Sequence, residues 1–232
     1  MLTISYCGYR FPSEIIQHAA WLYLRFTLSF RDVEDLLAER GIIVSYETVR
    51  RWVIYFGPRY AKQLRKQRCR PGRTWHLDEV FVSIGGRPMY LWRAVDQEGE
   101  ILDVLVQSTR DQRAAVRLMR KLLKKHGLAP REIVTDRLRS YGAAFQELRL
   151  SAVHVQGKRK NNRAESSHVP IRRRERRMQG FRSPAGAQRF LSSHAAVYNT
   201  FNVCRYLTTA KTHRILRAEA FAAWRDAVRA AA

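Results

Sequence analysis

The sequence predicts an α/β protein in which an all-α N-terminal module precedes a mixed five-stranded sheet flanked by helices. Apolar residues recur with helical spacing over the first sixty residues, whereas from Thr74 onwards runs of β-branched and aromatic residues alternate with turns. These later elements follow the order β-β-β-α-β-α-β-α. That order is typical of three antiparallel strands followed by parallel strands that helices connect.

Composition points to a polyanionic partner. The chain has 232 residues, and its 43 Lys and Arg against 20 Asp and Glu give a formal net charge of +23. A soluble domain with this excess repels itself unless it meets a polyanion, so we expect nucleic acid. No membrane association is expected, because His18 and Arg25 interrupt the most apolar stretch, residues 15–30. Three widely spaced cysteines argue against a disulfide framework and are compatible with a reducing cytoplasm.

Three helices are expected in the N-terminal module, over residues 13–26, 29–40 and 45–56. Each has a serine placed as its N-cap (Ser13, Ser29 and Ser45), and Gly41 ends the second helix. Two short helices around a glycine-containing turn, after an initial helix, form a helix-turn-helix pattern. The second of them would reach base edges in the major groove, so the expected DNA-binding residues are Tyr46, Arg50 and Arg51. A three-helix packing unit with ordinary solvated charges is the alternative.

The chain divides into four expected segments. The helix-turn-helix module covers residues 1–58, and residues 59–73 contain seven basic residues and no acidic ones, which indicates a basic linker. An α/β core then covers residues 74–182, and a helical segment covers residues 183–232. Within the core, strands are expected over residues 74–84, 89–96, 101–108, 132–136 and 152–156. Helices are expected from a cap at Ser108 or Thr109 to His126, over residues 140–148, and from about Asn162.

Three carboxylates lie at positions in this layout that suggest a common site. Asp78 lies in the middle of the first strand, Asp136 closes the fourth, and Glu165 lies in the first turn of the last helix. If the first and fourth strands are neighbours, the two aspartates come side by side and the helix can bring Glu165 to them. Clustered carboxylates repel one another unless cations neutralise them, and hard oxygen ligands select Mg²⁺ or Mn²⁺. Two such ions can clamp both oxygens that exchange at a phosphodiester.

Each acid also has a purely structural interpretation. Asp136 can cap the following loop, and Glu165 can form a capping box with Asn162. Asp78 can face the sheet edge with Glu79 pointing inward, although an unpaired acid inside a strand is costly. The order of the three acids along the predicted topology favours a metal site. His168 is expected on the helix surface.

Basic residues surround Glu165 in the sequence. Pro170 within this segment predicts a kink or break of the helix. A line of guanidinium groups beside a metal site would hold DNA phosphates against it. The expected DNA-binding residues here are Lys158, Arg159, Lys160, Arg172, Arg173 and Arg176.

Three runs of the chain carry a family resemblance: WHLDEVFVSIGG, IVTDRLRSYGAA and NNRAESSHVPIRRRERRMQGFRSPAGAQRF. They resemble bacterial insertion-sequence transposases of the DDE superfamily, and more narrowly the integrase-core group of the insertion sequence six family. The run RDVEDLLAERGIIVSYETVRRWV is similar to that family's helix-turn-helix. The resemblance therefore covers nearly the whole chain.

This resemblance implies a ribonuclease-H-like fold with Asp78, Asp136 and Glu165 as catalytic triad. It implies metal-dependent cleavage at terminal inverted repeats, strand transfer into target DNA, replicative transposition, and a homodimer or higher multimer in a bacterial cytoplasm, associated with the nucleoid. The 28 residues between Asp136 and Glu165 are fewer than is common in the superfamily. Two other functions stay open at this stage. One is a DNA-binding regulator with a non-catalytic α/β domain, and the other is a ribonuclease-H-like nuclease acting on RNA–DNA hybrids.

Overall fold

The computed structural model describes residues 4–203 and 208–229, without the side chains of Lys158 and Arg159. Contacts divide the chain into two compact units. One consists of the described parts of Met1–Arg68 and Ser192–Ala232, and the other is Cys69–Leu191. Cys7 and Cys69 are free, exposed thiols, and Cys204 lies outside the described residues. None of the helices in the described ranges is long and apolar enough to cross a membrane.

The helical unit is built around α3 (Tyr46–Lys66), which packs against α1 (Ser13–Arg25), α2 (Phe30–Ala38) and α8 (Ala210–Val228). The side chain of Ser29 caps α2 in a reciprocal capping box with Asp32, and Ser45 caps α3, as expected for both serines. Ser13 does not act as a cap. It is the first residue of α1, and Pro12 occupies the cap position.

The expected basic linker is shorter in the structure. α3 continues to Lys66, so the first eight residues of the segment 59–73 are helical. Tyr60 and Leu64 are buried on the apolar face of α3, which explains why the helix extends past Pro58. Part of that face is covered from the C-terminal end of the chain, since the ring of Trp224 in α8 packs edge-on against Tyr60.

The second unit contains the expected five-stranded mixed sheet. Its strands are β1 (Thr74–Ile84), β2 (Arg87–Asp96), β3 (Ile101–Gln107), β4 (Glu132–Thr135) and β5 (Val153–Gln156), in the spatial order β3-β2-β1-β4-β5. β1, β2 and β3 pair antiparallel, whereas β1 with β4 and β4 with β5 pair parallel. This is the predicted ribonuclease-H-like arrangement, with β1 at the centre between the two kinds of pairing.

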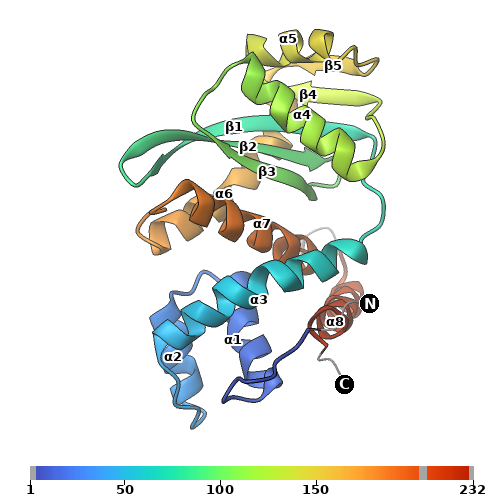
Figure 1. The fold of residues 1–232 in the computed structure, drawn as a ribbon. Coiled ribbons are helices and arrows are strands. Elements are labelled where there is room, and N and C mark those ends of the chain that lie inside the picture. The colour runs from blue at the N-terminus through green and yellow to red at the C-terminus, as the bar shows by residue number, and fades with distance from the viewer. Residues whose placement is uncertain (1–3, 204–207, 230–232) are drawn as a thin grey trace. The chain divides into compact units, whose positions relative to one another are not determined.

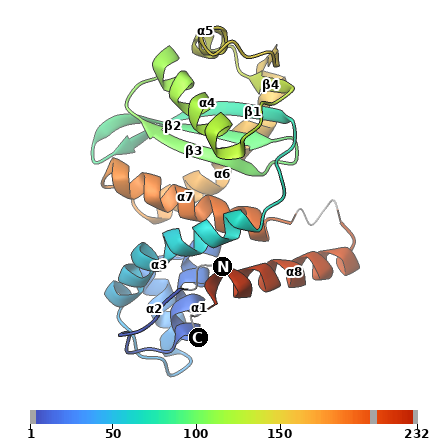
Figure 2. The ribbon, with the colours of Figure 1, turned by 45° about the vertical axis from the view of Figure 1, so that its right-hand side comes forward.

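Helices cover both faces of this sheet (Figures 1 and 2). α4 (Gln112–His126) and α5 (Arg139–Glu147) enclose a core with Trp75, Leu77 and Trp92 of the strands. On the other face lies α6 (Asn162–Arg177), which follows the short 3-10 helix η1 (Lys158–Asn161) and contacts β1 and β2. α7 (Pro184–Phe201) begins beside β3, where the Gln188 side chain hydrogen-bonds the backbone of β3.

Two local expectations for these helices need correction. The N-cap of α4 is Asp111, whose carboxylate accepts from the backbone N–H of Ala114 at 2.8 Å, and neither Ser108 nor Thr109 takes this place. α6 is one helix from Asn162 to Arg177, so the helix does not break at Pro170. Pro170 has no backbone N–H, so α6 lacks one backbone hydrogen bond there. Burial of the neighbouring Ile171 in the second unit keeps the helix in place.

Candidate active site

The parallel pairing of β1 and β4 leads towards Asp78 and Asp136. β1 and β4 pair in parallel with Thr74 opposite Glu132 and His76 opposite Val134. If this register continued for two more residues, it would set Asp78 opposite Asp136, at the spacing of about 4.8 Å that neighbouring strands have. Asp136 follows the last residue of β4, so the pair lies where that strand ends.

Asp78 and its neighbour Glu79 point to opposite faces of the sheet, because side chains alternate along a strand. Leu77 belongs to the core beneath α4 and α5, so Glu79 shares this face. Asp78 consequently faces α6, and His168 of that helix lies against it, with 3.1 Å between Nε2 and Oδ2. The side chain of Asp78 keeps 14% of its surface exposed, whereas that of Glu79 keeps none.

His168 is buried in the structure, with 6% of its surface exposed, so its expected place on the helix surface is wrong. Burial lowers the pKa of His168, and the contact with Asp78 opposes that shift. The sequence placed His168 one turn after Glu165, but it did not indicate that this side of α6 faces the sheet.

Glu165 lies in the first turn of α6 and is half-buried. The capping box suggested for Asn162 and Glu165 is not formed, because Asn161 holds the cap position and no side chain caps the helix. The Asn161 amide instead donates to the carbonyl of Leu77 at 2.8 Å, which ties the start of α6 to β1 just before Asp78. Glu165 and His168 are three residues apart and are therefore neighbours on the helix surface.

The three acids do not form a ready metal-binding cluster. Nowhere in residues 4–203 and 208–229 do three His, Cys, Asp or Glu side chains lie close enough together to hold a metal ion. Asp78 contacts His168, and Asp136 accepts from the backbone N–H of Leu138 at 2.9 Å, as its loop-capping interpretation expects. β1, the end of β4 and α6 thus carry the three acids, and the carboxylates of Asp78 and Asp136 have partners within the protein.

A second group of charged residues lies on the α4–α5 side of β1. Tyr141 of α5 donates its hydroxyl to Oε2 of Glu79 at 2.7 Å, and Arg110 donates Nε to Oε1 at 2.7 Å. Nη2 of Arg110 lies 2.6 Å from the same Oε1 and 3.6 Å from Oδ2 of Asp136. Arg110 therefore connects the buried Glu79 to Asp136 at the end of β4.

Burial controls the titration of this group. It raises the pKa of Glu79 to about 7, against the hydrogen bonds from Tyr141 and Arg110. It also raises the pKa of Tyr141, to which the charges of Glu79, Asp78 and Asp136 add. The charges of Asp78 and Asp136 thus both act on the hydroxyl group of Tyr141. Sequence reasoning gave no role to Glu79, Arg110 or Tyr141, because no spacing links the three.

The basic residues expected near Glu165 differ in how they lie. Lys160, Arg173 and Arg176 are exposed. Arg172 is partly committed inside the protein, since it donates to the Phe81 carbonyl of β1 and pairs with Glu175 at 2.9 Å. The side chains of Lys158 and Arg159 lie outside the described residues.

At the start of α3, Glu47 organises the expected DNA-binding residues. Arg50 donates Nε and Nη2 to the two oxygens of Glu47, both at 2.7 Å, and Arg51 reaches Glu47 at 3.3 Å. The guanidinium of Arg31 lies 4.5 Å from the ring centroid of the exposed Tyr46. These contacts hold the first turn of α3 in a defined, solvent-accessible arrangement.

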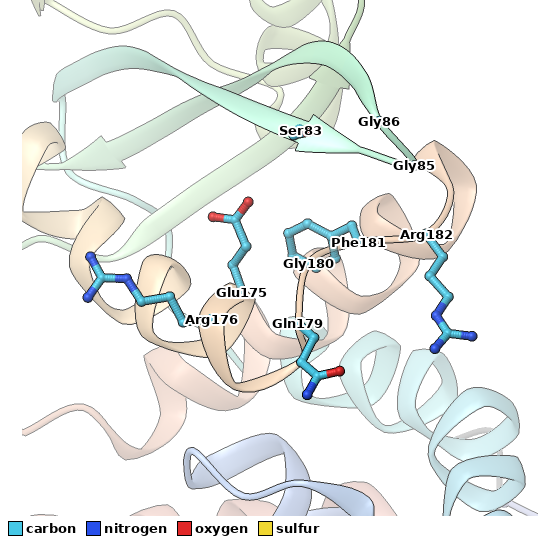
Figure 3. A pocket seen from close by; sticks show the side chains of 9 residues that line it. All are labelled: Ser83, Gly85, Gly86, Glu175, Arg176, Gln179, Gly180, Phe181 and Arg182. Carbon is cyan, nitrogen blue, oxygen red and sulfur yellow. The ribbon is translucent and has the colours of Figure 1, made fainter.

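A cavity of about 570 Å³ lies beside the β1–β2 hairpin tip and the turn after α6 (Figure 3). Gly85 at the tip has φ +57°, and a Cβ there would meet the Arg182 carbonyl at 2.8 Å, so this close approach requires glycine. Glu175 points towards the hairpin in Figure 3, while Arg182 points away from it. Asp78, Asp136 and Glu165 are not among the residues that line this cavity.

The sequence of the chain matches a family model and two transposases. A family model described as a DDE domain, of the IS240 transposase type, matches residues 72–203. The transposase for the insertion sequence-like element IS431mec of Staphylococcus aureus strain Mu50 is 31% identical over 202 residues, covering 84% of this chain and 89% of the relative. The transposase for IS257 in transposon Tn4003 of Staphylococcus aureus is 30% identical over the same shares.

Among solved structures, the HTLV-2 integrase catalytic core domain in complex with magnesium, in its trimeric form, has a TM-score of 0.45 at 15% identity. The likeness covers 58% of this chain and 90% of that chain. A simian T-cell lymphotropic virus intasome in complex with PP2A regulatory subunit B56 gamma has a TM-score of 0.47 at 13% identity, over 62% of this chain and 54% of that chain.

The family match defines the class of protein as a DDE-domain enzyme that cleaves nucleic acid and transfers strands. More narrowly, the chain belongs to the DDE transposases of the insertion sequence six family. This membership confirms the resemblance found in the sequence. It does not favour a regulator with a non-catalytic α/β domain or a nuclease specific for RNA–DNA hybrids.

Proposed function

We propose that this transposase cleaves DNA at the terminal inverted repeats of its insertion sequence and transfers the freed 3′ ends into target DNA by replicative transposition. Asp78, Asp136 and Glu165 are its catalytic acids. The observation that supports the proposal is the parallel pairing of β1 and β4, whose register runs towards Asp78 and Asp136, together with the hydrogen bond that ties the start of α6 to β1 just before Asp78.

The donor chemistry of this region fits divalent cations. Three carboxylates supply hard oxygen ligands, which suits Mg²⁺ or Mn²⁺, and we propose two ions per site. The contacts of Asp78 with His168 and of Asp136 with Leu138 and Arg110 leave further lone pairs on both aspartates. When bound, such ions polarise the phosphodiester and help ionise the attacking hydroxyl. The protein's own part is to hold the acids on two strands and one helix.

DNA engagement is divided between the two units in this proposal. Tyr46, Arg50 and Arg51 at the start of α3 contact base edges of the terminal repeats. Lys160, Arg173 and Arg176, with Lys158, Arg159 and Arg172, hold phosphates near the acids. The transposase works as a dimer or higher multimer on paired ends.

The test is a strand-transfer assay with Mg²⁺ on DNA that carries the terminal repeats. Asp78→Asn, Asp136→Asn and Glu165→Gln should each abolish product while DNA binding persists. Glu98→Gln is the matched control, because Glu98 is an exposed acid in the β2–β3 turn and its loss should leave activity unchanged. Full activity in any of the three variants would remove that residue from the active site.

A second readout does not depend on catalysis. Titration calorimetry with Mn²⁺ should detect binding to the wild type and weaker binding to Asp78→Asn, since a carboxamide is a poorer ligand than a carboxylate. Equal Mn²⁺ binding by both proteins would contradict the assignment of Asp78 as a metal ligand.

A further inference from the structure

The residues around Glu79 form an arrangement that the three proposed acids do not account for. Glu79 has no exposed side-chain surface, yet it is one residue from Asp78 and joins two donors, Tyr141 and Arg110. A carboxylate in the core costs free energy unless it is paired and hydrogen-bonded. An apolar side chain beneath α4 and α5 would avoid that cost.

Arg110 is only partly used by this arrangement. Its Nε and Nη2 both engage one oxygen of Glu79, while 44% of its side-chain surface stays exposed. Nη2 is also 3.6 Å from Asp136, which directly follows β4, so the guanidinium lies at the end of that strand. One edge of the guanidinium is thus held by a buried acid, and the group still reaches solvent beside the proposed site.

We propose that Arg110 binds a non-bridging oxygen of the DNA phosphodiester that is processed at this site. Glu79 and Tyr141 are positioning residues that fix the direction of the guanidinium. The proposal rests on the proposed function, because it takes the substrate to be a DNA strand at Asp78 and Asp136. It adds a residue from the β3–α4 connection, far in sequence from the arginines of α6.

Arginine suits this task for physical reasons. Its planar guanidinium presents five donors, so two can engage Glu79 while others face an anion. Preorganised donors aimed at a phosphoryl group lose little freedom on binding and stabilise the charge that develops there. The 3.6 Å separation from Asp136 is long for a hydrogen bond, so the guanidinium can still donate to a phosphate oxygen.

The experiment is a binding cycle with full-length protein and terminal-repeat DNA, in Ca²⁺ or without divalent ions. One DNA carries a native phosphodiester at the scissile position, and the other carries an uncharged methylphosphonate there. Arg110→Ala should weaken binding of the native DNA by about tenfold to a hundredfold, the range for a hydrogen bond to a charged group. On the methylphosphonate DNA the same substitution should have little effect.

Arg113→Ala is the matched control. Arg113 is an exposed arginine in the first turn of α4, three residues from Arg110. Loss of its charge should weaken binding of both DNAs equally and slightly. An equal loss on both DNAs for Arg110→Ala would overturn the proposal and leave Arg110 with a structural or non-specific electrostatic role.

Two further variants protect the test and separate the roles. If Arg110→Ala does not fold, Arg110→Lys enters the same cycle, because lysine keeps the charge but cannot engage Glu79 and a phosphate together. Tyr141→Phe should reduce the preference for native DNA partly, since Glu79 loses one of its donors. An unchanged preference in both Arg110→Lys and Tyr141→Phe would contradict the positioning by Glu79.

Failure of this inference is distinguishable from failure of the proposed function. The cycle measures binding without catalysis, whereas the proposed function is tested by product formation in Asp78→Asn, Asp136→Asn and Glu165→Gln. If those variants are inactive and Arg110 shows no preference for the charged DNA, the active site stands and the phosphate contact is overturned.

Discussion

Asp78 and Glu79 are consecutive residues of β1 with opposite surroundings. Asp78 keeps some exposure and faces α6, where His168 lies 3.1 Å away. Glu79 is fully buried beneath α4 and α5, where Tyr141 and Arg110 donate to it. A single strand thus presents an acid that a solute can reach on one face and an acid sealed into the protein on the other. Side-chain alternation in a strand can therefore separate a reactive carboxylate from a supporting one.

In the largest expected effect, substitution of Asp78 lowers activity, whereas substitution of Glu79 lowers stability. Asp78→Asn should reduce strand transfer by more than about a hundredfold, beyond the loss expected when only a ligand's supporting contact is removed. Its thermal stability should stay close to that of the wild type. Glu79→Gln should lower stability, because a carboxamide has only one acceptor oxygen for the two donors, Arg110 and Tyr141. Strand transfer with Mg²⁺ and thermal unfolding are measured for both variants. If both variants lost activity and stability to the same extent, Asp78 and Glu79 would not differ in role.

A smaller effect is expected from the partner of Asp78. His168→Ala should lower strand transfer by about tenfold to a hundredfold, since groups that orient a metal-binding carboxylate commonly contribute that much. The loss should appear in kcat and in Mn²⁺ affinity more than in KM for DNA, because His168 is buried. His168→Gln, which can still donate to Asp78, should recover part of the activity. Loss in KM alone would mean that His168 contacts DNA instead.

The smallest effect concerns the partner of Glu79. Tyr141→Phe should lower the free energy of unfolding by about 1 kcal/mol, the usual size of one hydrogen bond, and strand transfer should fall only a few-fold. Urea unfolding monitored by circular dichroism measures the first, and the strand-transfer assay measures the second. Phe145→Leu in the same helix is a control that alters packing without touching Glu79. A loss of strand transfer as large as in Asp78→Asn would move Tyr141 into the catalytic group.

Local patterns alone predicted most of the elements. The period of the apolar residues indicated the three N-terminal helices and α4, and the Gly85-Gly86 turn and the β-branched runs indicated the strands. Errors arose where neighbouring residues competed for one role. Asp111 displaced Ser108 and Thr109 as the cap of α4, and α3 continued through the expected linker because its apolar face found partners.

The sequence by itself determined the fold class, the family and the three acids as candidates, because these depend on period, order and motif along the chain. Only the tertiary structure decided that His168 is buried against Asp78 and that Arg110 links Glu79 to Asp136. Those contacts join residues 26, 31 and 90 positions apart. No local pattern encodes them, since they depend on strand order and on the face that each helix turns towards the sheet.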